Sequence, residues 1–367
     1  MRYYLIAGEA SGDLHGSYLM RAILELDPQA EFRFWGGDRM AEIAGSPVKH
    51  YQDLAFMGFV EVVANLRTIL GNMRLAKEDI TNFAPDRLIF IDYPGVNLRL
   101  AKWARPAGYD ITYYISPQIW AWHKSRVYQI RQHVDRMLCI LPFEPDFYAK
   151  YDYQAEFVGH PLLDVVADFQ AEQKEKKKAD ATKIVALLPG SRKQEIRTML
   201  PIMLSAACQL PEYEYVLAQA PAQSDEFYDD LLRRHNCPPE FRRVKNQTYS
   251  LLNEAEAALV TSGTATLETA LFGVPLVVCY KGNWLNYQIA RRLVDLKYIS
   301  LVNLILDEPL LTELIQSDLN TESLHKHLIS ILEGQERQTQ IEGFARLREL
   351  LGDRGAPRRA ALRIVRG

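Results

Sequence analysis

One apolar run in the sequence ends in an acid that could serve as a general base. Residues 88–97 read LIFIDYPGVN, so four bulky apolar residues precede Asp92 and a proline follows. An aspartate at the end of a buried strand can cap the next helix or take a proton from a substrate, and its position alone does not decide between these roles. Apolar surroundings in a ligand crevice would raise its pKa toward the working range of a base.

A second candidate segment, GEASGD, begins at Gly8, directly after the first apolar run. Gly8 and Gly12 permit a tight strand-to-helix turn, and Ser11 or Asp13 could cap the helix that follows. The segment is not GxGxxG, so the dinucleotide-binding fingerprint is absent. A structural turn and a substrate loop both fit, and Glu9 slightly favours the loop, because a carboxylate at the carboxyl end of a strand faces the ligand crevice.

A third segment, YYISPQIWAW, begins at Tyr113 and contains Gln118, Trp120 and Trp122. It is followed by the cationic or titratable residues His123, Lys124, Arg126 and Arg131. Core packing accounts for one tryptophan. Two tryptophans flanked by cations indicate a wall that meets a ring, an acyl chain or a phosphate.

Two segments in the second half of the chain are typical of anion sites. LLPGSR ends at Arg192 and offers backbone N–H groups at a helix start, with Gly190, Ser191 and a guanidinium beside them. A plain strand-to-helix turn is the alternative, but shape, donors and charge together favour the anion site.

The segment VTSGTATLETAL, which begins at Val260, offers small hydroxyl residues to a diphosphate. The candidate ligands are Ser262, Gly263, Thr264, Ala265 and Thr266. No Gly-Lys-Ser/Thr follows, so the segment is not a Walker A loop. Glu268 lies four residues after Thr264, one beyond capping-box spacing, which leaves its carboxylate available to ribose hydroxyls.

These segments lie between short apolar runs and amphipathic stretches, a pattern typical of parallel α/β sheets. Expected strands are 3–7, 88–91, 111–115 and 137–141 in the first half, and 184–188, 215–218, 257–261 and 276–280 in the second. Expected helices include 16–26, 59–73, a helical tail over 321–351 and a basic helix over 358–366. A charged stretch at 171–180 indicates an exposed connection or a surface helix and is compatible with a domain boundary there, and a chain of 367 residues predicts two domains.

Composition narrows the class of protein. The chain has 48% hydrophobic and 24% charged residues and a formal charge of -3, which argues against a dedicated nucleic-acid binder. Four widely spaced cysteines indicate reduced thiols in a cytoplasmic compartment rather than disulfides or a zinc site. The first apolar run is too short for a signal peptide, and no stretch approaches the ~18 apolar residues of a spanning helix.

An apolar stripe lies on the helix expected over 59–73. Its members are Phe59, Val62, Val63, Leu66, Ile69, Leu70 and Met73. Such a stripe is usually part of a core, and the alternative is an interfacial helix that admits acyl chains.

Taken together, these segments resemble the lipid A disaccharide synthase family. The motifs occur in the family's order between Gly8 and Gln316: GEASGDLHG, IDYPGVN, YYISPQIWAW, ILPFEPDFY, VGHPLLD, LLPGSRKQEI and SGTATLETAL. The resemblance implies a GT-B fold, in which two Rossmann-like doubly wound parallel-sheet domains face a cleft, with no metal and no cofactor. We expect an N-terminal domain over 1–167, a UDP-sugar domain over 183–345 and a helical tail over 346–367. The tail packs on an N-terminal domain, either its own or that of a dimer partner.

The resemblance also implies a reaction. The 6-hydroxyl of 2,3-diacylglucosamine 1-phosphate attacks UDP-2,3-diacylglucosamine with inversion, which gives UDP and a β-1′,6-linked disaccharide for lipopolysaccharide. The expected protein is a homodimer that binds no nucleic acid. It is expected in the cytoplasm, in peripheral contact with the cytoplasmic face of the inner membrane.

Residue roles carried over from the family are expectations of the same kind. Asp92 is the expected base, Glu9 an acceptor-side residue and Arg192 the arginine near the diphosphate. Donor-site positions are Gly190, Ser191, Arg192, Ser262, Gly263, Thr264, Ala265, Thr266, Glu268, Asn303 and Gln316. Acceptor, lipid or membrane contacts are Ser11, Gln118, Trp120, Val60, Val62, Val63, Leu66, Ile69 and Leu70.

The chain departs from the family pattern at two positions. It reads IDYPGVN where members often read IDxPDFN, and SLVN where they often read SLPN, so Gly95 lacks a second carboxylate and Val302 lacks a stiffening proline. The rival enzyme is another GT-B protein such as a UDP-sugar 2-epimerase, and the rival from another class is a nucleotide-sugar or lipid-binding module. Asp92 and Arg192 argue against the binding module, since pure binding has no use for a base.

Overall fold

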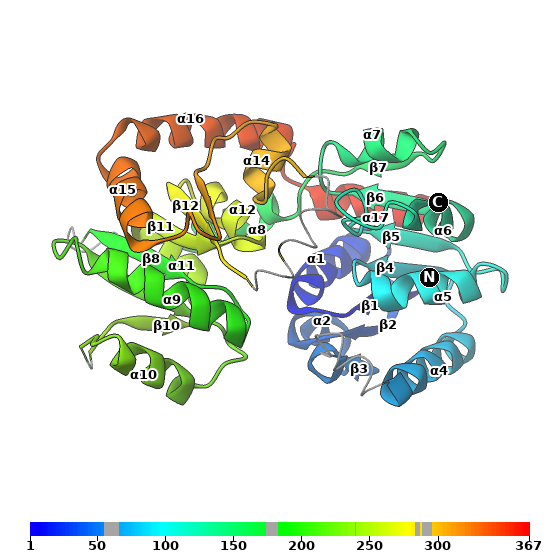
Figure 1. The fold of residues 1–367 in the computed structure, drawn as a ribbon. Helices are drawn as coiled ribbons and strands as arrows, with labels where there is room; N and C mark the ends of the chain where they lie inside the picture. The colour runs from blue at the N-terminus through cyan, green and yellow to red at the C-terminus, as the bar shows by residue number, and fades with distance from the viewer. Residues whose placement is uncertain (55–65, 174–182, 239, 283–286, 288–295) are drawn as a thin grey trace. The chain divides into compact units, whose positions relative to one another are not determined.

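The computed structural model describes residues 1–54, 66–173, 183–238, 240–282, 287 and 296–367. The chain forms two compact units, one of Met1–Pro161 with Asp353–Gly367 and one of Leu162–Gly352. Each unit has one parallel sheet with helices (Figure 1), so the predicted α/β class is confirmed.

The first unit contains a seven-stranded sheet. Its strands are β1 (Arg2–Ala7), β2 (Glu31–Gly36), β3 (Lys49–His50), β4 (Arg87–Ile91), β5 (Ile111–Tyr114), β6 (Arg136–Cys139) and β7 (Ala155–Phe157). Its helices are α1 (Ala10–Leu26), α2 (Asp38–Ala44), the 3-10 helix η1 (Tyr51–Leu54), α4 (Leu66–Phe83), α5 (Pro94–Ala104), α6 (Arg126–His133), α7 (Glu144–Ala149) and α17 (Ala356–Arg366). The strand order is β3-β2-β1-β4-β5-β6-β7. The strand order reverses between β1 and β4: earlier strands are added on one side of β1 and later strands on the other. Ligands of such sheets bind at the carboxyl ends of the two strands that flank this point.

The second unit repeats this plan with six strands. They are β8 (Ile184–Leu188), β9 (Glu214–Gln219), β10 (Arg243–Lys245), β11 (Ala255–Thr261), β12 (Leu276–Tyr280) and β13 (Glu313–Ile315). The helices are α8 (Leu162–Gln173), α9 (Lys193–Ala207), α10 (Asp225–Arg234), α11 (Thr248–Glu254), α12 (Thr264–Leu271), α14 (Leu301–Leu306), α15 (Thr321–Leu332) and α16 (Gln335–Leu350). The order β10-β9-β8-β11-β12-β13 changes direction between β8 and β11.

Burial explains which strands the sequence predicted. β8 and β12 match their predicted bounds, and central parallel strands, covered on both faces, are continuous apolar runs. The edge strands β3, β7, β10 and β13 are two or three residues long and mostly half-buried. They carry charged residues and little periodicity, so they were not predicted.

The helical segment expected over 321–351 consists of two helices, α15 and α16. The predicted span 321–351 breaks between α15 and α16, where Glu333 leaves helical geometry with φ -130. A Cβ on Gly334 would lie 2.7 Å from the carbonyl oxygen of Ser330, so no side chain fits at the break. The basic helix is confirmed as α17, which Figure 1 shows in red within the first unit.

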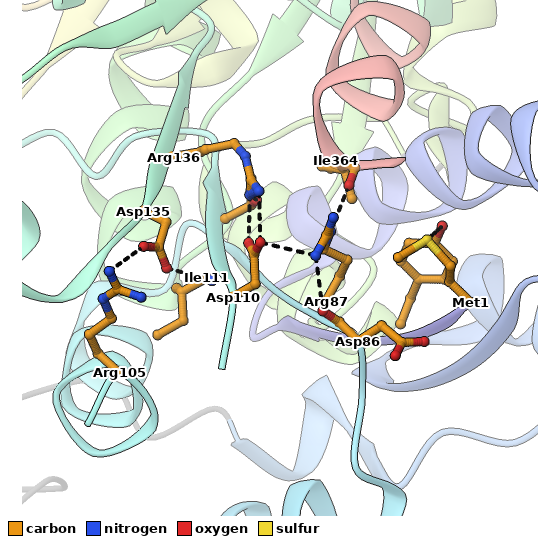
Figure 2. A network of polar contacts seen from close by, with 11 residues as sticks. Met1, Asp86, Arg87, Arg105, Asp110, Ile111, Asp135, Arg136 and Ile364 are labelled. Atoms are coloured by element: carbon orange, nitrogen blue, oxygen red, sulfur yellow. Dashed lines mark hydrogen bonds and ion pairs between the residues drawn. The ribbon is translucent and has the colours of Figure 1, made fainter. Parts of the chain in front are cut away.

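A polar network at the amino ends of β4, β5 and β6 fixes this last helix (Figure 2). Arg87 donates from Nε to the carbonyl oxygen of Ile364 at 2.9 Å, while its Nη1 lies 3.0 Å from Asp110 Oδ2. Arg136 donates to the same Asp110 carboxylate at 2.7 Å. α17 also packs against α1, so in this chain the tail completes its own first unit.

The compact units and the expected domains have different boundaries. Position 167 lies inside α8, which belongs to the second unit, and position 346 lies inside α16 of the same unit. The charged stretch 174–182 lies outside the described residues.

Candidate active site

Asp92 lies directly after β4, in a backbone conformation that residues other than glycine rarely adopt. Asp92 and Tyr93 have φ values of 43 and 50, both in the left-handed region. The Asp92 carbonyl accepts a hydrogen bond from Asn97 Nδ2 at 2.7 Å and another from the Tyr113 hydroxyl. Tyr93, not Asp92, is the N-cap residue of α5, so the capping alternative is wrong. Surroundings that hold a strained backbone in this way are typical of functional sites.

The electrostatics of Asp92 suit a base. Burial and, to a smaller extent, the negative charge of Glu9 raise the pKa of Asp92 to about 7, and a hydrogen bond from the Tyr93 backbone opposes the shift. A carboxyl group with such a pKa is partly ionised at neutral pH and can accept a proton there.

The turn after β1 is in contact with the Asp92 loop. A Cβ on Gly8 would lie 2.3 Å from the Tyr93 ring, so only glycine lets the two loops approach. Glu9 is the exposed N-cap residue of α1, and its side chain makes no capping hydrogen bond. The structure therefore brings the predicted residues Glu9 and Asp92 to one edge of the sheet, on the two strands flanking the change of direction.

The predicted caps of α1 are wrong. Ser11 and Asp13 lie inside the first turn of the helix, because α1 begins at Ala10. Ser11 is exposed, whereas Asp13 is buried and accepts backbone hydrogen bonds from Gly37 at 2.7 Å and from Met40 at 3.1 Å. Asp13 thus caps α2, a partner that is distant in sequence.

The aromatic segment contains one core tryptophan and one exposed tryptophan. Trp120 is buried and donates from Nε1 to Glu144 at 3.2 Å. Trp122 is 52% exposed, and the Arg126 guanidinium lies 5.9 Å from its ring centroid. Gln118 is exposed on the same loop, which begins at Ile115.

In the second unit, Arg192 lies at the start of α9, after β8. It is the N-cap residue of that helix, its side chain is 65% exposed, and its Nη1 lies 3.4 Å from Glu195 Oε1. Gly190 has φ 101, which permits the turn, and Ser191 is exposed beside it. The N-terminus of a 15-residue helix and a solvent-accessible guanidinium together suit a diphosphate.

The start of α12, after β11, offers open backbone. Gly263 is its N-cap residue with φ 154, and a Cβ there would meet nothing within 4 Å. Thr264 is exposed and Ala265 half-buried. The hydroxyls of Ser262 and Thr266 donate to the carbonyl oxygens of Ile299 and Gly263 at 2.9 and 2.8 Å, so what they can still offer a ligand is acceptor capacity.

The remaining donor-site candidates differ in their availability. Glu268 accepts the Tyr249 hydroxyl at 2.7 Å, and burial raises the pKa of its carboxyl group. Asn303 is buried, and its amide binds the backbone of Leu311 at 2.8 and 2.9 Å, so its contacts support the loop after α14. Gln316 follows β13 with φ 55.

Sequence reasoning missed further polar groups at this sheet edge. Gln219 and Thr261 end β9 and β11, and both are buried. Within the described ranges, Gln219 Nε2, Thr261 Oγ1 and Gln316 Nε2 are buried without a hydrogen-bond partner. Buried polar atoms are rarely left unpaired, so each of these atoms suits a ligand contact. The signal available in the sequence was a polar residue closing an apolar strand.

Comparison with known proteins decides the family. The sequence model of the family described as Lipid-A-disaccharide synthetase matches residues 3–362. The chain is 41% identical over 367 residues to the Lipid-A-disaccharide synthase of Syntrophus aciditrophicus, covering 98% of this chain and 95% of the relative. It is 40% identical over 370 residues to that of Trichlorobacter lovleyi, covering 98% and 96%.

The chain belongs to the lipid-A-disaccharide synthetase family. It is therefore a glycosyltransferase of lipid A biosynthesis, and the epimerase alternative is not favoured.

Solved structures confirm the GT-B fold. The chain resembles UDP-GlcNAc 2-epimerase from Neisseria meningitidis, with TM-score 0.68, 10% identity and complete coverage of both chains. It also resembles the glycosyltransferase of kitacinnamycin, with TM-score 0.66, 14% identity and 100% and 98% coverage. Acinetobacter baumannii MurG gives TM-score 0.57, 15% identity and 100% and 99% coverage. At such identities the likeness shows the fold alone.

The expected membrane-contact residues of this family member are only partly described. Val60, Val62 and Val63 lie outside the described residues, and Leu66 begins α4. Ile69 is half-buried and Leu70 is 60% exposed. Among the helices that the structure describes, none has the length and apolar character needed to cross a membrane.

Proposed function

We propose that this enzyme joins UDP-2,3-diacylglucosamine to 2,3-diacylglucosamine 1-phosphate, with inversion, and releases UDP. The observation that carries the proposal is Asp92, a half-buried carboxyl group with a pKa raised to about 7 where the strand order changes direction. Membership of the lipid-A-disaccharide synthetase family supports the donor and acceptor classes, a nucleotide sugar and a sugar phosphate.

In this reaction Asp92 accepts the proton of the acceptor 6-hydroxyl as that oxygen attacks the anomeric carbon of the donor. The new C–O bond forms on the face opposite the diphosphate, and the bond to UDP breaks with its electron pair on the leaving oxygen. Glu9 keeps the pKa of Asp92 high through its negative charge, which makes the ionised form a stronger base.

The second unit stabilises the departing diphosphate in this proposal. Arg192 supplies a guanidinium, and the N-terminal N–H groups of α9 and α12 supply partial positive charge. Preorganised donors of this kind need no rearrangement at the moment of bond cleavage.

The proposal includes peripheral membrane contact at the cytoplasmic face of the inner membrane, because both substrates carry acyl chains. Exposed apolar side chains at Leu70 and Leu75 of α4, 60% and 40% exposed, support it. A homodimer is proposed on the family resemblance alone. The basic tail packs on the first unit of its own chain here, and its packing on a partner's first unit is part of that proposal.

The test mixes the purified chain with both diacylated substrates and measures UDP release and product mass, with and without chelator. A tetra-acylated disaccharide 1-phosphate supports the proposal. Epimerisation or hydrolysis of the UDP-sugar without disaccharide would contradict it.

A further inference from the structure

Glu144 is a fully buried acid for which the proposed reaction has no use. It is the first residue of α7, and its side chain is 1% exposed. The carboxylate turns back onto the loop after β6, where Oε2 accepts backbone hydrogen bonds from Ile140 at 3.2 Å and Leu141 at 3.0 Å. Oε1 accepts the Nε1–H of Trp120 at 3.2 Å.

This carboxylate connects two loops at the carboxyl edge of the first sheet. Trp120 belongs to the loop after β5, and its ring meets Phe143 edge-on at a centroid distance of 4.9 Å. Ser116 on the same loop shares a hydrogen bond of 2.8 Å with the hydroxyl of Tyr148 on α7. The residues between Ser116 and Trp120 are therefore held at both ends by α7 and the residues preceding it.

The loop after β5 begins in strained backbone next to Asp92. Ile115 has φ 65, which a β-branched residue seldom adopts. The Asp92 N–H donates to the carbonyl oxygen of Tyr114 at 3.2 Å, one residue before Ile115. Strain of this kind persists only where the surroundings fix it, and the Glu144 contacts supply that restraint on the β5 side.

We propose that Glu144 is a positioning residue for the acceptor: its carboxylate fixes the loop after β5 and so places Gln118 and Trp122 at the sheet edge that carries Asp92. The inference rests on the proposed function.

Only a carboxylate fits these contacts. Both oxygens face N–H donors, so a glutamine at this position would direct its own NH2 group at either Trp120 or the backbone of Ile140 and Leu141. Burial raises the pKa of Glu144 to about 7, and the four donors, Leu141, Trp120, Ile140 and Ser116, act in the opposite direction and favour the charged form.

The experiment compares wild type with Glu144→Gln, Trp120→Phe, the double variant and Tyr153→Phe. Tyr153→Phe removes one hydrogen bond, from the Tyr153 hydroxyl to the carbonyl oxygen of Val134, and keeps the ring that packs against Tyr148. Each protein is assayed with acceptor varied at saturating donor, and then with donor varied at saturating acceptor. Hydrogen exchange of the peptide amides across 115–122 gives a second measurement that needs no activity.

We expect Glu144→Gln to lower kcat/KM for the acceptor about 10- to 100-fold, with the donor KM changed less than about two-fold. Trp120→Phe keeps an aromatic ring at this position and removes the N–H that Glu144 accepts, so its effect is smaller and the double variant falls short of the product of the single effects. Exchange across 115–122 rises in both single variants and stays at the wild-type level in Tyr153→Phe.

Equal losses for donor and acceptor, or unchanged exchange across 115–122, would overturn the inference. If Glu144→Gln does not fold, Trp120→Phe decides by the same two measurements. Failure of the proposed function is distinguishable, because wild type itself would then form no disaccharide.

Discussion

The carboxyl edges of the two sheets have the same kind of topology but carry groups of opposite charge. At the edge of the first unit, Asp92 is half-buried and Glu144 is buried, and the pKa values of both carboxyl groups are raised to about 7. At the edge of the second unit, Arg192 is exposed beside a helix N-terminus, and buried polar atoms such as Gln219 Nε2 have no partner within the described residues.

The difference teaches what each half brings to the proposed reaction. The first unit presents the proposed base, Asp92, whose pKa is set by burial, Glu9 and Tyr93 of that same unit. The second unit contains buried hydrogen-bond donors, such as Gln219 Nε2, that have no partner among the described residues. A bound ligand would satisfy them. Changes in the first unit should therefore act on the chemical step and its pH dependence, and changes in the second on donor affinity and leaving-group departure.

The largest expected effect is that of Asp92→Asn. The amide cannot accept the acceptor proton, so kcat should fall about 10²- to 10⁴-fold. Because the proposed donor contacts all lie in the second unit, UDP binding measured by titration calorimetry should stay at the wild-type value. A parallel loss of UDP affinity would contradict the division of roles between the two units.

Arg192→Ala should have the next largest effect. Loss of one charge-stabilising donor should lower kcat about 10²- to 10³-fold, with a weaker affinity for UDP. Arg197→Ala is the matched control, since Arg197 is exposed on the same helix and lies 5.4 Å from the Phe227 ring centroid. Steady-state rates and UDP titrations on both variants test this. Equal losses in the two would show that Arg192 does not contact the diphosphate specifically.

Glu9→Gln should shift a pH profile rather than abolish activity. In the proposed reaction the ionised form of Asp92 is the base, so kcat/KM should fall as the pH falls through its pKa, which is raised to about 7. Removing the negative charge of Glu9 lowers that pKa, and the acid limb of the profile should move to lower pH. Glu25→Gln, an exposed change on the same helix, should leave the limb in place. An unshifted limb in Glu9→Gln would show that burial alone sets the pKa of Asp92.

Local patterns predicted the central strands other than β2 and the loops that follow them, because buried parallel strands are apolar runs and their ends carry the polar residues. The strand β2 was missed because its first half carries exposed charged residues. Contacts between distant segments were beyond such patterns. Asp13 reads as a cap for its own helix but caps α2, more than twenty residues away. Glu144 reads as an ordinary first-turn acid, and only the fold brings Trp120 to it. Likewise, Asn303 matches a donor-site position, but its amide binds Leu311.

The smallest effects should come from two buried glutamines of the second unit. Gln219 Nε2 has no partner among the described residues, whereas the Gln340 amide accepts from Leu276 N at 2.8 Å and donates to Leu276 O at 3.1 Å. Gln219→Leu removes an unpaired buried group, so the stability of the free protein should stay level or rise. Gln340→Leu breaks two buried hydrogen bonds and should lower the free energy of unfolding by about 1–3 kcal/mol.

Gln219→Leu should be the more stable of the two variants without ligand, but it should gain less stability from UDP. If Gln219 contacts the donor, the rise in melting temperature on adding UDP should shrink in Gln219→Leu and keep its wild-type size in Gln340→Leu. Thermal unfolding at matched UDP concentrations measures both quantities on the same samples. A full UDP response in Gln219→Leu would mean that its amide is not part of the donor site, and the contrast between the two sheet edges would then rest on Arg192 and the helix N-termini alone.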